Sequence, residues 1–214
     1  MAAMSSTPVD GAADACVVGR PGVGKTLFVL RFAQWSGQRR LLVRQEAPGA
    51  SGGWGEGDLA TAVERLVGTS TPTTRALQHV EVPWRQGKRT LRLRLLDTVG
   101  LTDAIHPDPL LRRAMAETLT AVMESLVVLH VLDGPRIAQR PARLLDEDDV
   151  DVQISRYGQR RGRYAVLVNK LDRPGGRAGL EAVRRAWPQR IVLGISALEG
   201  WGFASVRRFL QRRL

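Results

Sequence analysis

Residues 19–26 carry the side chains and backbone best suited to chemistry in this chain. They read Gly-Arg-Pro-Gly-Val-Gly-Lys-Thr, which fits the phosphate-binding pattern G-x-x-x-x-G-K-[ST]. The glycines let backbone N–H groups curl around phosphate oxygens, and a helix that begins there adds positive potential. We expect Lys25 to reach the β- and γ-phosphates and the Thr26 hydroxyl to ligate Mg²⁺. The predicted phosphate-binding residues are Gly19, Arg20, Pro21, Gly22, Val23, Gly24, Lys25, Thr26 and Leu27.

A second candidate motif, Asp-Thr-Val-Gly, occupies residues 97–100 directly after the apolar run 91–96. A carboxylate at the end of a strand can hold Mg²⁺ through water, so Asp97 is a predicted metal residue. The Gly100 N–H can meet the γ-phosphate and sense its loss, which gives Gly100 a predicted catalytic role beside Lys25.

The third motif, Asn-Lys-Leu-Asp, spans residues 169–172 and follows the apolar run 164–168. The Asp172 carboxylate can accept two hydrogen bonds from the guanine N1–H and amino group. Adenine offers neither donor there, and a site built around such donors rejects the wrong base by roughly 10⁴-fold. We expect Asn169 to support the base and the phosphate loop, and the Lys170 stem to pack on the ring.

Two weaker elements complete the predicted site. Backbone N–H groups of Ser196, Ala197 and Leu198 would bind guanine O6, an assignment that depends on motif order. A threonine in residues 70–75, Thr74 in preference to Thr73, would ligate Mg²⁺ only when the γ-phosphate is present. The predicted metal set is therefore Thr26, Thr74 and Asp97, and Thr74 also joins the catalytic set.

The elements that must position these motifs alternate between strand and helix, which predicts an α/β fold. Apolar runs predict strands over residues 15–18, 41–43, 80–84, 91–96, 126–132, 164–168 and 191–195. Periodic patterns predict helices over residues 25–35, 58–67, 109–125, 149–158, 180–187 and 203–213. The Gly- and Pro-rich stretch 47–57 is predicted to be loop. We expect a disordered leader over 1–14, followed by one nucleotide-binding domain over 15–214.

The charge balance is strongly basic, with 32 Lys and Arg against 21 Asp and Glu and a net charge of +11. Only three of the basic residues are lysines, and two of those fall inside the motifs. Such a surface can mean contact with RNA, a ribosome or an anionic membrane, but because the arginines are dispersed along the chain, a compositional bias toward arginine is the favoured interpretation. The densest clusters are residues 160–163 and 207–213. We expect a cytoplasmic protein without a membrane span or secretory signal, and a buried, inert Cys16.

Taken together, the motifs resemble the translation-factor-related class of P-loop GTPases, in particular its Era-like and TrmE-like families. The Gly-Arg-Pro start of the first motif, Thr-Thr-Arg at 73–75 and Asp-Thr-Val-Gly-Leu at 97–101 carry the resemblance. It implies a Ras-like P-loop NTPase fold, with a mostly parallel six-stranded sheet and helices on both faces. It also implies bound GTP or GDP with Mg²⁺, and a protein or ribosomal partner.

The sequence departs from that pattern at several places. Gly22 stands where Era-like proteins often have an Asn that helps bind K⁺, so potassium dependence is open. Leu101 takes the place of the water-positioning Gln of Ras-like proteins, which predicts slow intrinsic hydrolysis or a catalytic group from elsewhere; His106 is the candidate nearby. The segment 37–68 is longer than a minimal domain needs, which predicts an extended switch I region over about 37–75.

These observations predict a molecular switch that hydrolyses GTP to GDP and phosphate. A second hypothesis keeps nucleotide binding but makes the output a partner contact, with negligible hydrolysis. A third is an RNA- or ribosome-binding assembly factor, suggested by the charge. A P-loop ATPase is disfavoured by Asp172.

Overall fold

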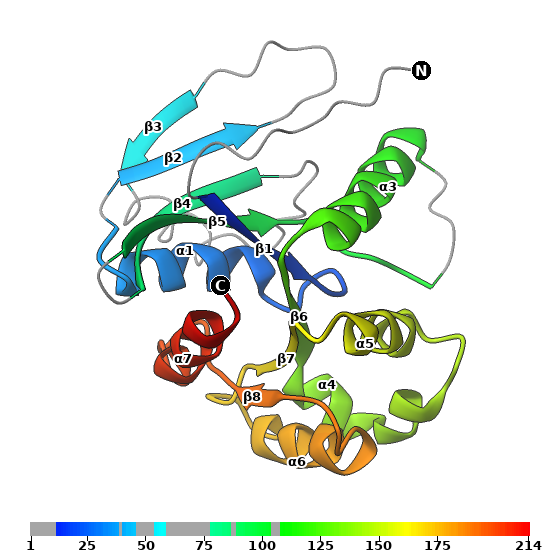
Figure 1. Ribbon diagram of the computed structural model, residues 1–214. Helices are drawn as coiled ribbons and strands as arrows, with labels where there is room; N and C mark the ends of the chain where they lie inside the picture. The colour runs from blue at the N-terminus through cyan, green and yellow to red at the C-terminus, as the bar shows by residue number, and fades with distance from the viewer. Residues whose placement is uncertain (1–11, 39, 46–53, 59–77, 87–88, 104–107) are drawn as a thin grey trace.

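One eight-stranded sheet organises the chain, with strand order β3-β2-β4-β5-β1-β6-β7-β8 (Figure 1). The computed structural model describes residues 12–38, 40–45, 54–58, 78–86, 89–103 and 108–214. The strands are β1 (Ala12–Val18), β2 (Arg40–Gln45), β3 (Trp54–Asp58), β4 (Gln78–Gln86), β5 (Arg89–Asp97), β6 (Val127–Asp133), β7 (Tyr164–Asn169) and β8 (Val192–Gly194).

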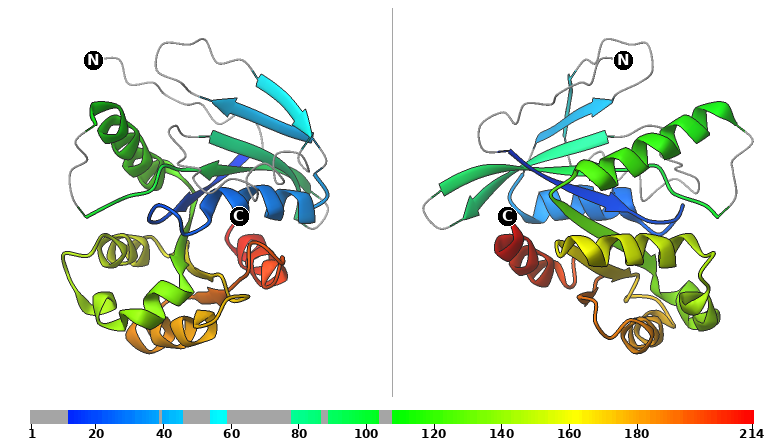
Figure 2. Two further views of the ribbon diagram at one scale, coloured as in Figure 1. Left: turned by 180° about the vertical axis from the view of Figure 1, so that it is seen from behind. Right: turned by 45° about the vertical axis from the view of Figure 1, so that its right-hand side comes forward.

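The helices cover both faces of this sheet. They are α1 (Lys25–Trp35), α3 (Pro109–Glu124), α4 (Gly134–Gln139), the 3₁₀ turn η1 (Pro141–Leu145), α5 (Val150–Arg161), α6 (Gly176–Ala186) and α7 (Phe203–Arg213). On one face α1 and α7 pack around Phe28, Phe32 and Phe203. On the other face α3, α4, α5 and α6 pack against the opposite side of the same strands, as the second view of Figure 2 makes visible.

The alternation of side chains along β1 explains how one strand serves both layers. Ala15 and Val17 belong to the α1–α7 core, whereas Cys16 and Val18 belong to the opposite core. Successive strand residues point to opposite faces, so a fully apolar run suits a strand covered on both sides. Cys16 is buried there, and burial raises the pKa of its thiol to about 12, with the Asp97 charge adding to that effect. This thiol stays protonated and inert.

The predicted α/β fold is confirmed, with an addition at one edge. Strands β5, β1, β6, β7 and β8 pair in parallel, and β4 pairs antiparallel with β5, which gives the expected six strands. Strands β2 and β3 extend the sheet beyond β4 and pair antiparallel with each other. The predicted loop over 47–57 is therefore wrong for residues 54–57, which lie in β3.

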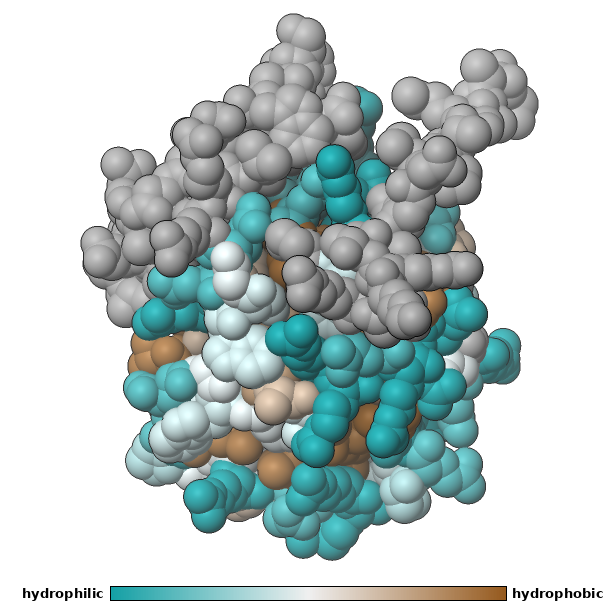
Figure 3. Space-filling view, turned by 60° about the vertical axis from the view of Figure 1, so that its left-hand side comes forward, coloured by the Kyte–Doolittle hydropathy of each residue, from teal (hydrophilic) through white to brown (hydrophobic). Residues whose placement is uncertain are grey.

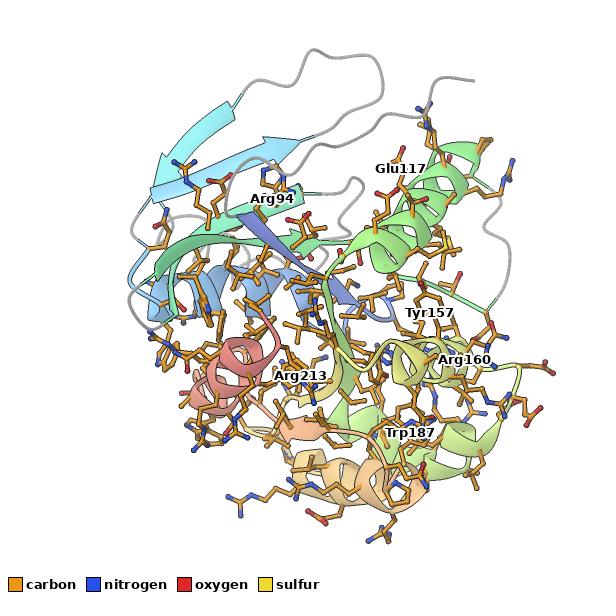
Figure 4. The ribbon with its side chains drawn as sticks, viewed as in Figure 1. Arg94, Glu117, Tyr157, Arg160, Trp187 and Arg213 are labelled. Carbon is orange, nitrogen blue, oxygen red and sulfur yellow. The ribbon has the colours of Figure 1, made fainter. Side chains whose placement is uncertain are left out.

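Most predicted elements differ from the observed ones by a few residues at their ends, α6 by four residues at its start, and two further differences concern residues 12–14 and 58–67. β1 begins at Ala12, inside the expected leader, because its first residues pair with β5. There the Asp14 Oδ1 accepts a hydrogen bond from Arg94 Nε at 2.5 Å; Arg94 is labelled in Figure 4. Asp58, the predicted N-cap of a helix over 58–67, is instead the last residue of β3, and residues 59–67 lie outside the described residues.

Helix α4 and the turn η1 have no counterpart among the predicted elements. Asp133 caps α4 by accepting the Arg136 N–H at 3.0 Å, and Pro135 stands in the first turn, where its missing N–H costs no hydrogen bond. The Asp-Gly-Pro sequence at the end of β6 was the available signal for this helix.

Candidate nucleotide-binding site

The predicted phosphate loop connects the end of β1 to the start of α1. Gly24 precedes the helix with a φ of +96°, a left-handed conformation that favours glycine. A Cβ on Gly24 would lie 2.5 Å from Asn169 Nδ2, so a larger residue would also push the third motif away. The loop is thus held in a tight curve by backbone conformation and by its neighbour on β7.

Lys25 lies under this loop with 6% of its surface exposed. Its Nζ donates to the carbonyl oxygens of Gly19 at 3.1 Å and of Arg20 at 3.0 Å. Burial lowers the pKa of Lys25, while the negative charge of Asp97 opposes that shift. The ammonium group is therefore held at the loop by weak carbonyl partners, where an incoming phosphate would offer a stronger one.

Asp97 ends β5 with 2% of its surface exposed. Among the described residues, neither of its carboxylate oxygens makes a hydrogen bond of regular geometry, although the Thr26 hydroxyl lies close enough to act on the carboxylate. Burial raises the pKa of Asp97 to about 6, against the opposing influence of the Thr26 hydroxyl and the Lys25 charge. A buried carboxylate in this state fits a hydrated divalent cation, which would restore both its charge balance and its hydrogen bonds.

The segment after Asp97 runs along the phosphate loop. The Thr98 hydroxyl donates to the Val17 carbonyl at 2.8 Å, and the Leu101 N–H donates to the Gly19 carbonyl at 3.2 Å. A Cβ on Gly100 would lie 2.5 Å from the Pro21 nitrogen, so only glycine permits this approach. Leu101 itself is 2% exposed and packs in the core on the α3 side, so its side chain points away from the site.

Asn169 joins the phosphate loop to the last motif. Its Nδ2 donates to the Val23 carbonyl at 2.8 Å, and its Oδ1 accepts the Ala197 N–H at 2.9 Å. The three groups come from residues that are each at most 2% exposed. One buried amide therefore sets the spacing between the loop that would hold phosphates and the loop that would hold a base.

Lys170 has a φ of +67°, the only non-glycine residue with positive φ among those described. Its Nζ donates to the Gly22 carbonyl at 2.8 Å and to Asp133 Oδ2 at 2.5 Å. Sequence reasoning missed Asp133, although its place at the carboxyl end of a central parallel strand was a usable signal. Asp133 therefore anchors the Lys170 ammonium group next to the phosphate loop.

The remaining predicted base-site residues also come together. Asp172 Oδ1 accepts the Ser196 hydroxyl at 2.5 Å, and Ser196 Oγ accepts the Glu199 N–H at 3.1 Å. The carboxylate is thereby oriented by the neighbouring loop. Leu198 in that loop and Leu27 on α1 are both partly buried. The candidates Thr73, Thr74 and His106 lie outside the described residues.

Arg20 makes a group of contacts that motif reasoning did not anticipate. Its guanidinium pairs with Asp103 beyond the second motif, and with Asp149 and Asp151 at the start of α5. Burial opposes its charge, but the hydrogen bonds to Asp103 and the nearby Asp151 more than offset this and raise the pKa of Arg20. These partners lie 83 and more residues away along the chain, so no local signal revealed them.

No protein-family model and no curated protein sequence matches this chain. Solved structures do match it. Era from Aquifex aeolicus bound to GDP·AlF4⁻ aligns with a TM-score of 0.64 and 18% identity, over 95% of this chain and 57% of its own. Era in complex with MgGDPNP and nucleotides 1506–1542 of 16S ribosomal RNA gives a TM-score of 0.59 and 20% identity over the same shares.

The chain has the fold of an Era-type GTPase domain. The G domain of the T. maritima FeoB iron transporter also aligns, with a TM-score of 0.57 and 12% identity, over 94% of this chain and 98% of the FeoB domain. The chain thus spans nearly the whole FeoB domain but little more than half of each Era structure. The predicted P-loop GTPase fold is confirmed by these comparisons, and the motifs lie at or after the carboxyl ends of β1, β5, β7 and β8.

Proposed function

We propose that this protein binds GTP and GDP and hydrolyses GTP to GDP and phosphate. The observation that carries the proposal is the tie that Asn169 makes between the phosphate loop and the 196–198 loop, with Asp172 oriented beside it by Ser196. The loop that would bind phosphates and the carboxylate that would recognise guanine are therefore held at a fixed separation. The similarity of the fold to nucleotide-bound Era structures supports the same conclusion.

We propose that Thr26, Asp97 and, from the part of the chain that the structure does not describe, Thr74 hold Mg²⁺ together with the nucleotide. The buried carboxylate of Asp97, with the Thr26 hydroxyl close enough to lower its pKa, supports this assignment. Bound there, the cation would neutralise charge on the β- and γ-phosphates.

The residues of the chain would act on the γ-phosphate from two sides. Lys25 Nζ would exchange its carbonyl partners for phosphate oxygens and stabilise the negative charge of the transition state. The Gly100 N–H would contact the γ-phosphate and lose that contact after hydrolysis. Because Leu101 is buried in the core, the attacking water takes no help from that side chain, so we propose a slow intrinsic rate that a partner accelerates.

The test is titration of the purified protein with fluorescent GTP, GDP and ATP in Mg²⁺, followed by phosphate release. The matched variant Asp172→Asn replaces a carboxylate by an amide and should shift preference from guanine toward xanthine nucleotides. Binding of both guanine nucleotides without ATP, and loss of GTP preference in the variant, are the expected results. Equal GTP affinity in the variant would place the base site elsewhere, and guanine binding without phosphate release, with or without cell extract, would leave a passive switch.

A second candidate function, contact with RNA, is favoured by helix α7. It contains four arginines and no acidic residue, and Arg208, Arg212 and Arg213 are exposed. Folding also brings an aromatic ring to this helix, because the Arg207 guanidinium lies 6.0 Å from the ring of Trp35, which is 44% exposed. Among the residues that Figure 3 colours, hydrophobic ones are scattered among hydrophilic ones instead of forming one broad apolar region.

This surface has a natural control on the other side of the sheet. Arg213 belongs to α7 and Arg160 to α5, which cover opposite faces, and both are labelled in Figure 4. Changing Arg208, Arg212 and Arg213 to Gln should weaken binding to single-stranded RNA and lower the log–log salt slope by about 2. The control changes Arg160, Arg163 and Arg177 to Gln. Equal losses in both variants would point to nonspecific charge.

No helix among the described residues is both long and apolar enough to cross a membrane.

A further inference from the structure

Arg20 of the phosphate loop is surrounded by three carboxylates from two other segments. Its Nη1 donates to Asp103 Oδ2 at 2.7 Å while its Nη2 donates to the other oxygen of Asp103. Its Nε donates to Asp151 Oδ2 at 2.9 Å, and its Nη2 lies 3.0 Å from Asp149 Oδ2. A bidentate guanidinium–carboxylate pair fixes orientation as well as distance. The loop is thereby tied at one point both to the segment that follows the second motif and to α5.

The buried half of this cluster is complete without Asp103. Arg143 on η1 donates through Nε to Asp149 at 3.0 Å and through Nη2 to Asp151 at 2.8 Å. His130 on β6 lies beside it, with Nε2 3.0 Å from Asp151 Oδ1. Trp187 stacks on His130 and lies on the α6 side of α5 in Figure 4. The part of the cluster formed by Arg143, Asp149 and Asp151 is therefore held in place by ion pairs and by side-chain packing.

Asp103 differs from the other carboxylates in exposure. Its side chain is 51% exposed, against 8% for Asp149 and 3% for Asp151. With Asp103 in place, two guanidinium groups face three carboxylates; without it, two face two. Asp103 can move into water without leaving a buried charge unpaired, whereas loss of Arg20 would leave the two buried carboxylates of Asp149 and Asp151 with a single guanidinium, that of Arg143. The ion pair between Arg20 and Asp103 is therefore the contact of the cluster that can break at the lowest cost.

Asp103 is also placed where nucleotide state would act on it. Six residues before it, Asp97 stands at the candidate Mg²⁺ site. Between them, Gly100 lies against Pro21 and the Leu101 N–H donates to the Gly19 carbonyl. Asp103 Oδ1 also accepts the Val150 N–H at 2.8 Å, in the first turn of α5. The Asp103 side chain thus contacts both the phosphate loop, through Arg20, and the first turn of α5, through the Val150 N–H.

We propose that Asp103 is a latch that holds the 97–103 segment docked on the phosphate loop through Arg20 and transmits this docking to α5 through Val150. The docked state places Gly100 beside the loop, as contact with a γ-phosphate requires, so closure of the latch favours GTP over GDP. By reciprocity, bound GTP favours the closed latch and an ordered first turn of α5. This inference rests on the proposed nucleotide binding.

The test compares wild type with Asp103→Ala in two measurements. In the first, affinities for GDP and for a non-hydrolysable GTP analogue are measured with Mg²⁺. The ratio favouring the analogue should fall about fivefold, the low end of the usual coupling range because Asp103 is half-exposed. In the second, hydrogen exchange of the nucleotide-free protein is followed at the Leu101 and Val150 amides, and both should exchange faster in the variant.

The control variant is Glu147→Gln. Glu147 pairs with Arg156 on the exposed side of α5, so this change removes one carboxylate from the same region and should alter neither reading. If Asp103→Ala proves unstable, Asp103→Asn keeps the size of the side chain and an oxygen for the Val150 N–H, and it should shift the affinity ratio and the Leu101 exchange in the same direction.

The outcomes are separable. An unchanged affinity ratio, or unchanged exchange at Leu101, would overturn the latch. If wild type binds neither guanine nucleotide, the proposed function fails, and the exchange measurement on the nucleotide-free protein still decides whether Asp103 docks the segment.

Discussion

Replacing Asn169 by alanine removes a buried side chain that joins the phosphate loop to the 196–198 loop. The Val23 carbonyl and the Ala197 N–H both lose their partner, in residues that are 2% and 1% exposed. Each buried polar group left without a partner costs about 1–3 kcal/mol, so we expect the free energy of unfolding to fall by about 2–6 kcal/mol. Release of the two loops from each other should also lower GDP affinity by at least about tenfold, which corresponds to 1.4 kcal/mol.

Urea denaturation, with and without GDP, measures both effects on the same samples. The matched variant Asn169→Asp keeps an oxygen for the Ala197 N–H but faces the Val23 carbonyl with a second acceptor, so it isolates the contact to the phosphate loop. The reasoning is refuted if Asn169→Ala loses less than about 0.5 kcal/mol and binds GDP like wild type, because surface substitutions reach that range without any buried contact.

Three further predictions concern the segment that begins at Asp97. Folding raises the pKa of Asp97 from 3.8 to about 6, so its contribution to stability is complete below 3.8 and is lost as the pH rises through 6. Without metal or nucleotide, Asp97→Asn should therefore exceed wild type in stability by up to about 3 kcal/mol at pH 7.5, and by much less at pH 4, in urea titrations; an equal difference at both pH values would contradict this. Gly100→Ala should lower affinity for a GTP analogue about tenfold and change GDP affinity little, because its Cβ would meet the Pro21 backbone; equal losses for both nucleotides would argue against a γ-phosphate contact. Leu101→Gln should lower the free energy of unfolding by about 2–4 kcal/mol without accelerating phosphate release, because the side chain points into the core, and faster release would show that it reaches the site.

The sequence predicts the candidate site better than it predicts the two strands, β2 and β3, that extend the sheet beyond β4. The phosphate loop, Asp97, Asn169 and the 196–198 loop each follow a strong apolar run, and parallel strands bring their carboxyl ends to one edge. The fold class follows from the same alternation. Strand β3 is different, because Trp-Gly-Glu-Gly-Asp has little strand preference of its own, and its conformation comes from pairing with β2. Pairing between distant segments also explains the early start of β1.

The Arg20 cluster lies beyond sequence reasoning for another reason. Asp103, Asp149 and Asp151 each occur in polar stretches that suit solvated turns or a helix cap, and Arg20 fills a variable position of the phosphate-binding pattern. The fold brings them together, because Arg20 follows β1, Asp103 follows β5, and Asp149 and Asp151 lie at the start of α5. The carboxylates of Asp149 and Asp151 point to a functional role only once the fold shows that both are buried beside the loop that would bind phosphate.

The backbone carbonyls of the phosphate loop bear on the proposal that this loop binds an anion. The carbonyl oxygens of residues 19, 20, 22, 23 and 24 each accept a hydrogen bond from elsewhere in the chain. The donors are Lys25 Nζ, the Leu101 N–H, Lys170 Nζ, Asn169 Nδ2 and the Phe28 N–H. Carbonyls that are occupied in this way are held away from a phosphate, and clustered N–H groups at a helix start attract negative charge. The lysines and the asparagine therefore fix the backbone of the loop, in addition to any contact that we propose they make with a ligand.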